Sequence, residues 1–118
     1  MNCLSISYRT ADIEIRKQLS FDSAQKRSIM SALTADGGEC VLLCTCNRTE
    51  LYFGGAALDT AARLLTSYSG AEDLPEHLRI YEGENAYRHL FRVACGIDSM
   101  LIGEDEILRQ VKEFGVQP

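Results

Sequence analysis

Residues 40–53 read CVLLCTCNRTELYF. The first five are apolar and β-prone, which is enough for one buried strand, and residues 51–53 form a second β-prone run closed by two glycines. Asn47 and Arg48 lie between the runs and are predicted to form the turn. Because the runs are adjacent in sequence, we expect them to pair as an antiparallel β-hairpin around which the rest of the chain is organised.

Cys46 stands at the end of the first run and is a candidate nucleophile. A cysteine at a strand end is partly exposed, and the neighbouring Arg48 stabilises a thiolate over a thiol. Two other readings stay open. Most strand cysteines are small core residues, and Cys40, Cys44 and Cys46 share the parity of one strand face, which would suit a thiolate metal site. Structural zinc sites usually draw their ligands from two separated pairs, however, and no second Cys or His pair follows.

Apolar periodicity and end signals predict the other elements. Asp22 with Gln25 forms the pattern of a helix capping box, and Gly70 suits the left-handed end of a helix. Strands are predicted over residues 2–8 and 78–83, a short helical turn over 13–16, and helices over 23–35, 58–68, 85–95 and from 104 onward.

The order of these elements predicts an α+β fold. A β-α-β-β-α-β order is buried most simply by a ferredoxin-like antiparallel sheet with two helices on one face, here with additional C-terminal helices. A length of 118 residues is expected to give one domain with one core.

Composition limits the classes of function. The net charge of −5 argues against an electrostatic nucleic-acid clamp over the whole surface. No apolar run approaches the roughly 18 residues of a membrane span, so no membrane partner is expected. Five cysteines, an odd number with no export signal, fit a reducing cytoplasm.

Two stretches resemble a known family. Residues 45–52, TCNRTELY, and residues 96–112, GIDSMLIGEDEILRQVK, are similar to the two main signatures of glutamyl-tRNA reductase, with a weaker match at Thr10, Ala11 and Arg16. The resemblance spans nearly the whole chain and identifies residues 1–118 as the N-terminal catalytic domain. It implies the same fold class.

The resemblance also implies a reaction. Cys46 would attack the ester that joins glutamate to its tRNA, and NADPH would reduce the resulting thioester to glutamate-1-semialdehyde, the precursor of 5-aminolevulinate in tetrapyrrole (porphyrin) biosynthesis. The chain has no Gly-x-Gly-x-x-Gly turn, so cofactor and dimerisation domains are expected beyond it. A homodimer of the full-length enzyme, and glutamate-1-semialdehyde aminomutase as a partner, are further expectations from the family.

The same match assigns site residues. Cys46 and His89 would be catalytic, although periodicity alone makes His89 a structural residue. Arg48 would grip the substrate carboxylate, and Glu104 would pair with the α-ammonium group. The implied glutamate pocket is formed by Thr45, Cys46, Asn47, Arg48, Ser99, Glu104, Asp105, Glu106 and Gln110.

Some positions depart from the family pattern. Tyr8, Arg9 and Asp12 stand where the family has His, Lys and Pro, and Arg109 stands where it often has Gly. Asp105 and Glu106 replace a Pro-Gln pair, which leaves the hydrogen bonding of Glu106 open. The alternative function is a ferredoxin-like RNA-binding or regulatory module without catalysis.

Overall fold

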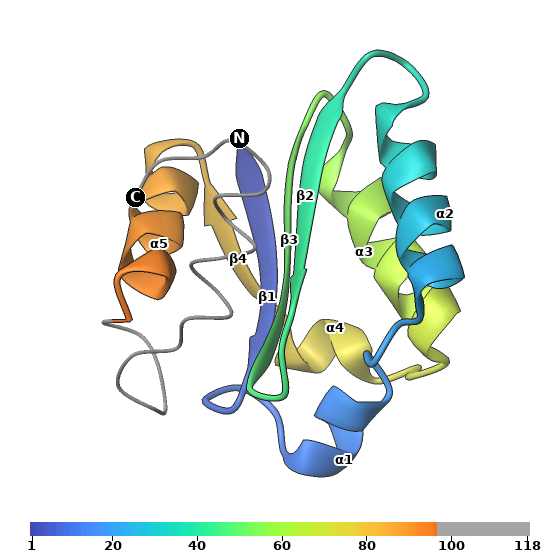
Figure 1. Ribbon diagram of the computed structural model, residues 1–118, viewed down its shortest axis with the longest axis vertical. Helices are drawn as coiled ribbons and strands as arrows, with labels where there is room; N and C mark the ends of the chain where they lie inside the picture. Colours follow the sequence, from blue (N-terminus) through green and yellow to red (C-terminus); the bar gives the residue numbers. More distant parts are fainter. Residues whose placement is uncertain (97–118) are drawn as a thin grey trace.

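The computed structural model describes residues 1–96, which form a sheet with helices on both faces (Figure 1). The sheet is antiparallel in the order β2-β3-β1-β4, so the predicted fold class is confirmed. Its strands are β1 Asn2–Ser7, β2 Glu39–Cys44, β3 Arg48–Gly54 and β4 Arg79–Glu82.

Two long helices cover one face and a third covers the other (Figure 1). The predicted capping box is present, because Asp22 accepts the Gln25 N–H and the Gln25 side chain accepts the Asp22 N–H. Gly70 ends its helix at a φ of 72°, a left-handed conformation that costs a glycine little. The helices are α1 Ile13–Lys17, α2 Ser23–Thr34, α3 Leu58–Ser69, α4 Leu74–His77 and α5 Glu84–Ala94.

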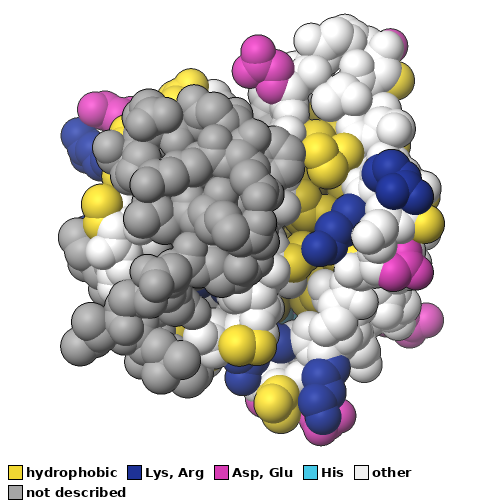
Figure 2. All heavy atoms as spheres, in the orientation of Figure 1, with side chains coloured by type: hydrophobic (Ala, Val, Ile, Leu, Met, Phe, Trp, Pro, Cys, Tyr) yellow, Lys and Arg dark blue, Asp and Glu magenta, His cyan; other side chains and the backbone are white. Residues whose placement is uncertain are grey.

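The strands alternate their side chains between two hydrophobic clusters. Toward α2 and α3 the sheet contributes Leu4, Ile6 and Leu51, all almost fully buried. Toward α5 it contributes Cys3, Leu43 and Tyr52, which pack against Leu90 and Val93 of that helix. Beside the edge strand β2, Figure 2 shows hydrophobic side chains at the surface next to α2.

The face toward α5 becomes polar at one end of the sheet. Ser5 lies opposite Glu50, and Ser7 lies opposite Arg48, on the neighbouring strands β1 and β3. All four are buried. The β2–β3 turn lies at this end, together with α1 and α4 (Figure 1), so the fold brings the turn and the buried polar row close together.

Arg48 was expected in the turn, but it begins β3 with a buried side chain. Leu74 and Pro75 open the short helix α4, which the sequence did not predict and where a proline at the start costs no hydrogen bond. The predicted helix from residue 104 lies outside the described residues. Within residues 1–96, no helix combines the length and apolar character needed to span a membrane.

Candidate functional site

Cys46 lies in the turn between β2 and β3 and is exposed. The Thr45 N–H donates to the Arg48 carbonyl at 2.8 Å, which closes the turn. The Thr45 hydroxyl oxygen accepts the N–H groups of Asn47 and Arg48 at 3.2 and 3.3 Å. A local side-chain to backbone bond of this kind fixes a tight turn. Thr45 therefore holds the backbone on which Cys46 is presented.

The connector after β1 fixes the same turn from outside. The Tyr8 N–H donates to the Asn47 carbonyl at 2.9 Å. Arg16 Nη1 donates to the Cys46 carbonyl at 3.0 Å, so the guanidinium that touches the cysteine backbone is that of Arg16. Arg16 is 30 positions before Cys46, and Tyr8 is 39 positions before Asn47. Two segments that are distant in sequence therefore hold the backbone that carries the thiol.

The other cysteines differ from Cys46 in burial. Burial raises the pKa of the Cys44 and Cys40 thiols, both of which are half-buried. Burial, and then the charge of Glu50, raise the pKa of Cys3 well above its ordinary value. Among the cysteines in the described part of the chain, only Cys46 and Cys95 are exposed. Cys46 is therefore the accessible thiol of the hairpin.

Limited alkylation near pH 7 tests this ranking. In a Cys95→Ser chain, which removes the competing exposed thiol, we expect iodoacetamide at limiting concentration to modify Cys46 before Cys40, Cys44 or Cys3. Exposure admits the reagent, and thiols with raised pKa hold little thiolate. Peptide mass spectrometry over time gives the order. Faster labelling of Cys40 or Cys44 would contradict it.

Arg48 projects into the protein rather than into the turn. Its side chain has no exposed surface, its Nη1 lies 3.5 Å from Glu50 Oε2, and its guanidinium lies over the Tyr8 ring at 5.9 Å. A buried arginine needs a carboxylate and an aromatic face to replace water. The turn position expected from sequence is thus corrected, because strand pairing begins at Arg48 and turns its side chain toward α5.

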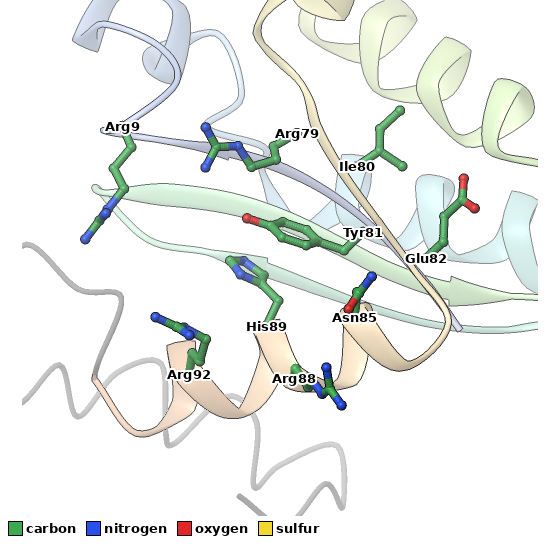
Figure 3. A pocket seen from close by; sticks show the side chains of 9 residues that line it. All are labelled: Arg9, Arg79, Ile80, Tyr81, Glu82, Asn85, Arg88, His89 and Arg92. Atoms are coloured by element: carbon green, nitrogen blue, oxygen red, sulfur yellow. The ribbon is translucent and has the colours of Figure 1, made fainter.

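His89 lies on the opposite side of the same polar row. It projects from α5, is 5% exposed, and stacks on Tyr81 of β4 with ring centroids 4.0 Å apart (Figure 3). It also lines a cavity of about 760 Å³ between β4 and α5. The imidazole therefore joins the buried row to an open cavity.

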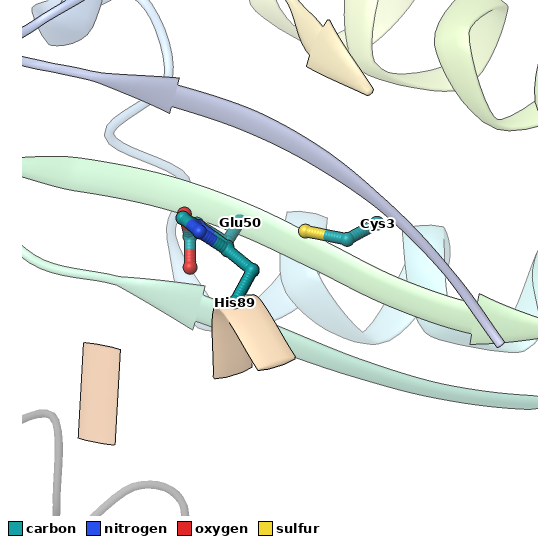
Figure 4. A group of neighbouring side chains, drawn as sticks. All are labelled: Cys3, Glu50 and His89. Atoms are coloured by element: carbon teal, nitrogen blue, oxygen red, sulfur yellow. The ribbon is translucent and has the colours of Figure 1, made fainter. Parts of the chain in front are cut away.

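Glu50 connects these groups. Its side chain is fully buried and accepts hydrogen bonds from the Ser5 hydroxyl at 2.6 Å and the Tyr52 hydroxyl at 2.7 Å. His89 Nε2 lies 2.5 Å from the same Oε2 that pairs with Arg48 (Figure 4). Four side chains from three elements thus converge on one carboxylate.

The network keeps Glu50 ionised. Burial raises the pKa of its carboxyl, but the hydrogen bond and charge of His89, with the hydrogen bonds from Ser5 and Tyr52, outweigh burial and bring the pKa below its ordinary value of 4.5. Burial, followed by the charge of Glu50, raises the pKa of Tyr52, which therefore stays a hydroxyl donor. An anionic acceptor is thus held among donors.

The lowered pKa gives a pH prediction. A carboxyl whose pKa falls on folding adds stability that is complete above its unfolded pKa and disappears as pH falls through the folded one. We expect the difference in unfolding free energy between wild type and Glu50→Gln to shrink as pH falls below 4.5, the ordinary pKa of the carboxyl. Urea unfolding at several pH values below about 5 measures it, and a difference that grows over that range would contradict the assignment.

One group of metal-ligand type occurs in residues 1–96. Ligand atoms of Cys3, Glu50 and His89 lie within 4.8 Å of one another (Figure 4). A cation there would have to displace the hydrogen bond between Glu50 and His89 and lie beside the Arg48 guanidinium. The donor set is already used as a hydrogen-bonded ion pair. The thiolate site considered for Cys40, Cys44 and Cys46 does not form among the described residues, where this group alone has suitable spacing.

The structure brings part of the expected site together. Thr45, Cys46 and Asn47 share the turn, and Arg48 and His89 meet through Glu50. The expected pocket residues Ser99, Glu104, Asp105, Glu106 and Gln110 lie outside the described residues. Sequence reasoning missed Glu50, Ser5, Tyr52 and Tyr81. The available signal was the alternation of Arg48, Glu50 and Tyr52 along one strand face.

Comparisons with known proteins find relatives that match nearly the whole chain. Residues 4–116 match the family described as glutamyl-tRNAGlu reductase, N-terminal domain. Glutamyl-tRNA reductase of Bacillus pumilus is 43% identical over 117 residues, which are 92% of this chain and 26% of that protein. The Deinococcus radiodurans enzyme is 38% identical over 109 residues, which are 92% of this chain and 31% of the relative.

A solved structure gives the same result. Glutamyl-tRNA reductase from Methanopyrus kandleri superposes with a TM-score of 0.70 at 36% identity, covering 95% of this chain and 26% of that one. The chain spans between 26% and 31% of the length of the three relatives named here. The chain belongs to the glutamyl-tRNA reductase family, whose N-terminal domain it matches.

Proposed function

We propose that this chain is the acyl-accepting domain of a glutamyl-tRNA reductase, in which Cys46 takes the glutamyl group from glutamyl-tRNA as a thioester. The observation that carries the proposal is the position of Cys46. It is an exposed thiol on a turn fixed by Thr45 and Arg16, beside a buried charged row, within a chain of this family.

The transfer step requires only the Cys46 thiol and the glutamyl ester of the tRNA. The Cys46 sulfur gives up its proton and forms a bond to the carbonyl carbon of the ester. The bond from that carbon to the ribose oxygen breaks, and the ribose hydroxyl leaves with a proton. The thiolate suits this step because it is nucleophilic near neutral pH, whereas a hydroxyl is not.

The buried row can position His89 for proton transfer. When Nε2 donates to Glu50, Nδ1 is the ring nitrogen left to exchange a proton with the substrate, since the bond made by one nitrogen sets the role of the other. Arg48 pairs with the same Glu50 carboxylate, and Tyr81 stacks on the His89 ring. We assign His89 the proton transfer and Glu50 the role of positioning residue.

The described residues do not fit a nicotinamide cofactor. They form an antiparallel sheet, whereas dinucleotides bind at the strand ends of a parallel sheet next to a glycine-rich turn. No step through NADPH is derived for them. Reduction of the thioester, the NADPH site, a homodimer, the aminomutase partner and a cytoplasmic location therefore stay predictions about the whole protein.

Intact mass spectrometry tests the proposal. Incubating the chain with glutamyl-tRNA should add the mass of one glutamyl group, and hydroxylamine, which cleaves thioesters, should remove it. Uncharged tRNA is the control and should add nothing. Peptide mapping should place the adduct at Cys46. A wild-type chain that forms no adduct with glutamyl-tRNA, or forms it elsewhere, would overturn the assignment.

A further inference from the structure

Four exposed arginines surround the cavity between β4 and α5 (Figure 3). Arg9 comes from the connector after β1, Arg79 from β4, and Arg88 and Arg92 from α5. The two helical arginines are four positions apart and therefore share one face. The whole lining is Arg9, Arg79, Ile80, Tyr81, Glu82, Asn85, Arg88, His89 and Arg92.

The charge of this cavity is opposite to that of the chain. Four arginines against the single carboxylate of Glu82 give a local balance of +3, counting His89 as neutral, while the chain carries −5. A cavity lined by one sign of charge concentrates ligands of the other sign. The chain is therefore acidic as a whole but carries a basic groove.

The groove continues past β4. A second cavity, of about 470 Å³, shares Arg9, Arg79 and Ile80 with the first. Tyr81, half-buried and stacked on His89, adds an aromatic surface of the kind on which unstacked bases pack. A row of guanidinium groups beside an aromatic ring is typical of a site for single-stranded nucleic acid.

Edge protection alone does not explain this groove. Charges on an edge strand keep it from pairing with other strands, which would account for Arg79 and Glu82 of β4. Arg88 and Arg92, however, lie on a helix, and Arg9 lies on a loop. Arg88 donates to Glu84 at 3.0 Å in a solvent-exposed pair that releases its arginine at little cost.

The groove adjoins the turn that carries Cys46. Arg9 follows Tyr8, whose N–H is bonded to the Asn47 carbonyl in that turn. His89, which lines the groove, contacts Glu50, and Glu50 pairs with Arg48, the first residue after the turn. A ligand with its ester at Cys46 could therefore extend along the arginines.

We propose that this groove binds phosphates of the single-stranded 3′ end of the tRNA. The proposal rests on the proposed function, because it takes glutamyl-tRNA as the substrate. Arginine binds phosphate through a planar fork of donors, and each such contact makes binding sensitive to salt. The four arginines would hold the strand while its terminal ester lies at the turn.

Binding of an uncharged tRNA acceptor minihelix, labelled with fluorescein and followed by anisotropy, tests the groove. The variant is Arg79→Gln with Arg92→Gln. The matched control is Arg27→Gln with Arg63→Gln, which removes the same charge from exposed positions on α2 and α3, across the sheet. Thermal unfolding checks that both variants fold.

We expect the groove variant to bind about tenfold more weakly, with its plot of log affinity against log salt flatter by about 1.4, or 0.7 per lost contact to a single strand. The control should bind as wild type does. Equal affinity of the groove variant, or an equal loss in the control, would overturn the proposal. Tighter binding of NADPH than of the minihelix, lost in the groove variant, would also overturn it.

A wild-type arm separates this inference from the proposed function. The wild-type chain is treated with a benzyl thioester of glutamate, which carries no phosphate, and the Cys46 adduct is measured by mass spectrometry. No adduct with this reagent or with glutamyl-tRNA means that the proposed function fails. An adduct together with unchanged minihelix binding in the groove variant means that only the groove assignment fails.

Discussion

Replacing Cys46 by serine is expected to abolish transfer of the glutamyl group, with a loss in rate of about 1,000-fold or more, as is usual when a covalent nucleophile is removed. The substitution keeps the shape of the side chain on an exposed turn, so the fold should be unchanged. A hydroxyl at neutral pH holds almost no anion and attacks an ester poorly. The time course of the glutamyl adduct by intact mass measures the loss.

Cys44→Ser is the matched control, two residues earlier in the hairpin. Cys44 is half-buried against the cluster beneath α2, so its change should lower stability by about 1–3 kcal/mol, because a hydroxyl is more costly than a thiol to remove from water. Adduct formation should remain close to wild type. An adduct that survives in Cys46→Ser, or that disappears in Cys44→Ser with the fold intact, would contradict the assignment of the nucleophile.

The parts of the fold that sequence predicted are those with local causes. The capping box of Asp22 and Gln25 and the left-handed Gly70 act within one helical turn, so they could be read from spacing alone. The two apolar runs around residues 40–53 required only that neighbouring strands pair. Each of these signals is complete within about ten residues.

Arg48 shows why the site was harder to predict. Its sequence position beside Cys46 suggested a turn, but the bond from the Thr45 N–H to the Arg48 carbonyl starts β3 at that residue. Its burial depends on Glu50, and Glu50 depends on Ser5 and His89, which are 45 and 39 residues away. A charged residue in a strand is usually solvated, so no local pattern indicated an ion pair under α5.

The burial of His89 could be predicted from sequence only in part. The helix over residues 85–95 was predicted, and its apolar residues Ala86, Leu90 and Val93 are buried. His89 precedes Leu90 and follows Ala86 by three residues, so it lies on the border of that face. Periodicity therefore allowed its burial, but the carboxylate partner came from another strand. In the same way, a net charge of −5 could not reveal four arginines from three segments around one cavity.

The ion pair under α5 gives the second large effect. Glu50→Ala is expected to lower the free energy of unfolding by about 3–5 kcal/mol, because it leaves the Arg48 guanidinium buried beside an empty space. Glu50→Gln keeps the volume and should cost less, about 1–3 kcal/mol, since two hydroxyl donors still find an acceptor. Urea unfolding measures both. Asp59→Ala, at an exposed pair on α3, is the control and should change stability by less than about 0.5 kcal/mol.

Replacing both charges separates stability from function. In Arg48→Met with Glu50→Leu no buried charge is left unpaired, and apolar substitutes for a buried pair are often neutral in stability. We expect this double variant to recover most of the stability lost in Glu50→Ala, while His89 loses its acceptor and the glutamyl adduct forms more slowly at Cys46. A double variant as unstable as Glu50→Ala would show that the other partners of Glu50, and not the unpaired arginine, dominate its contribution. Wild-type adduct formation in a stable double variant would remove the row from the mechanism.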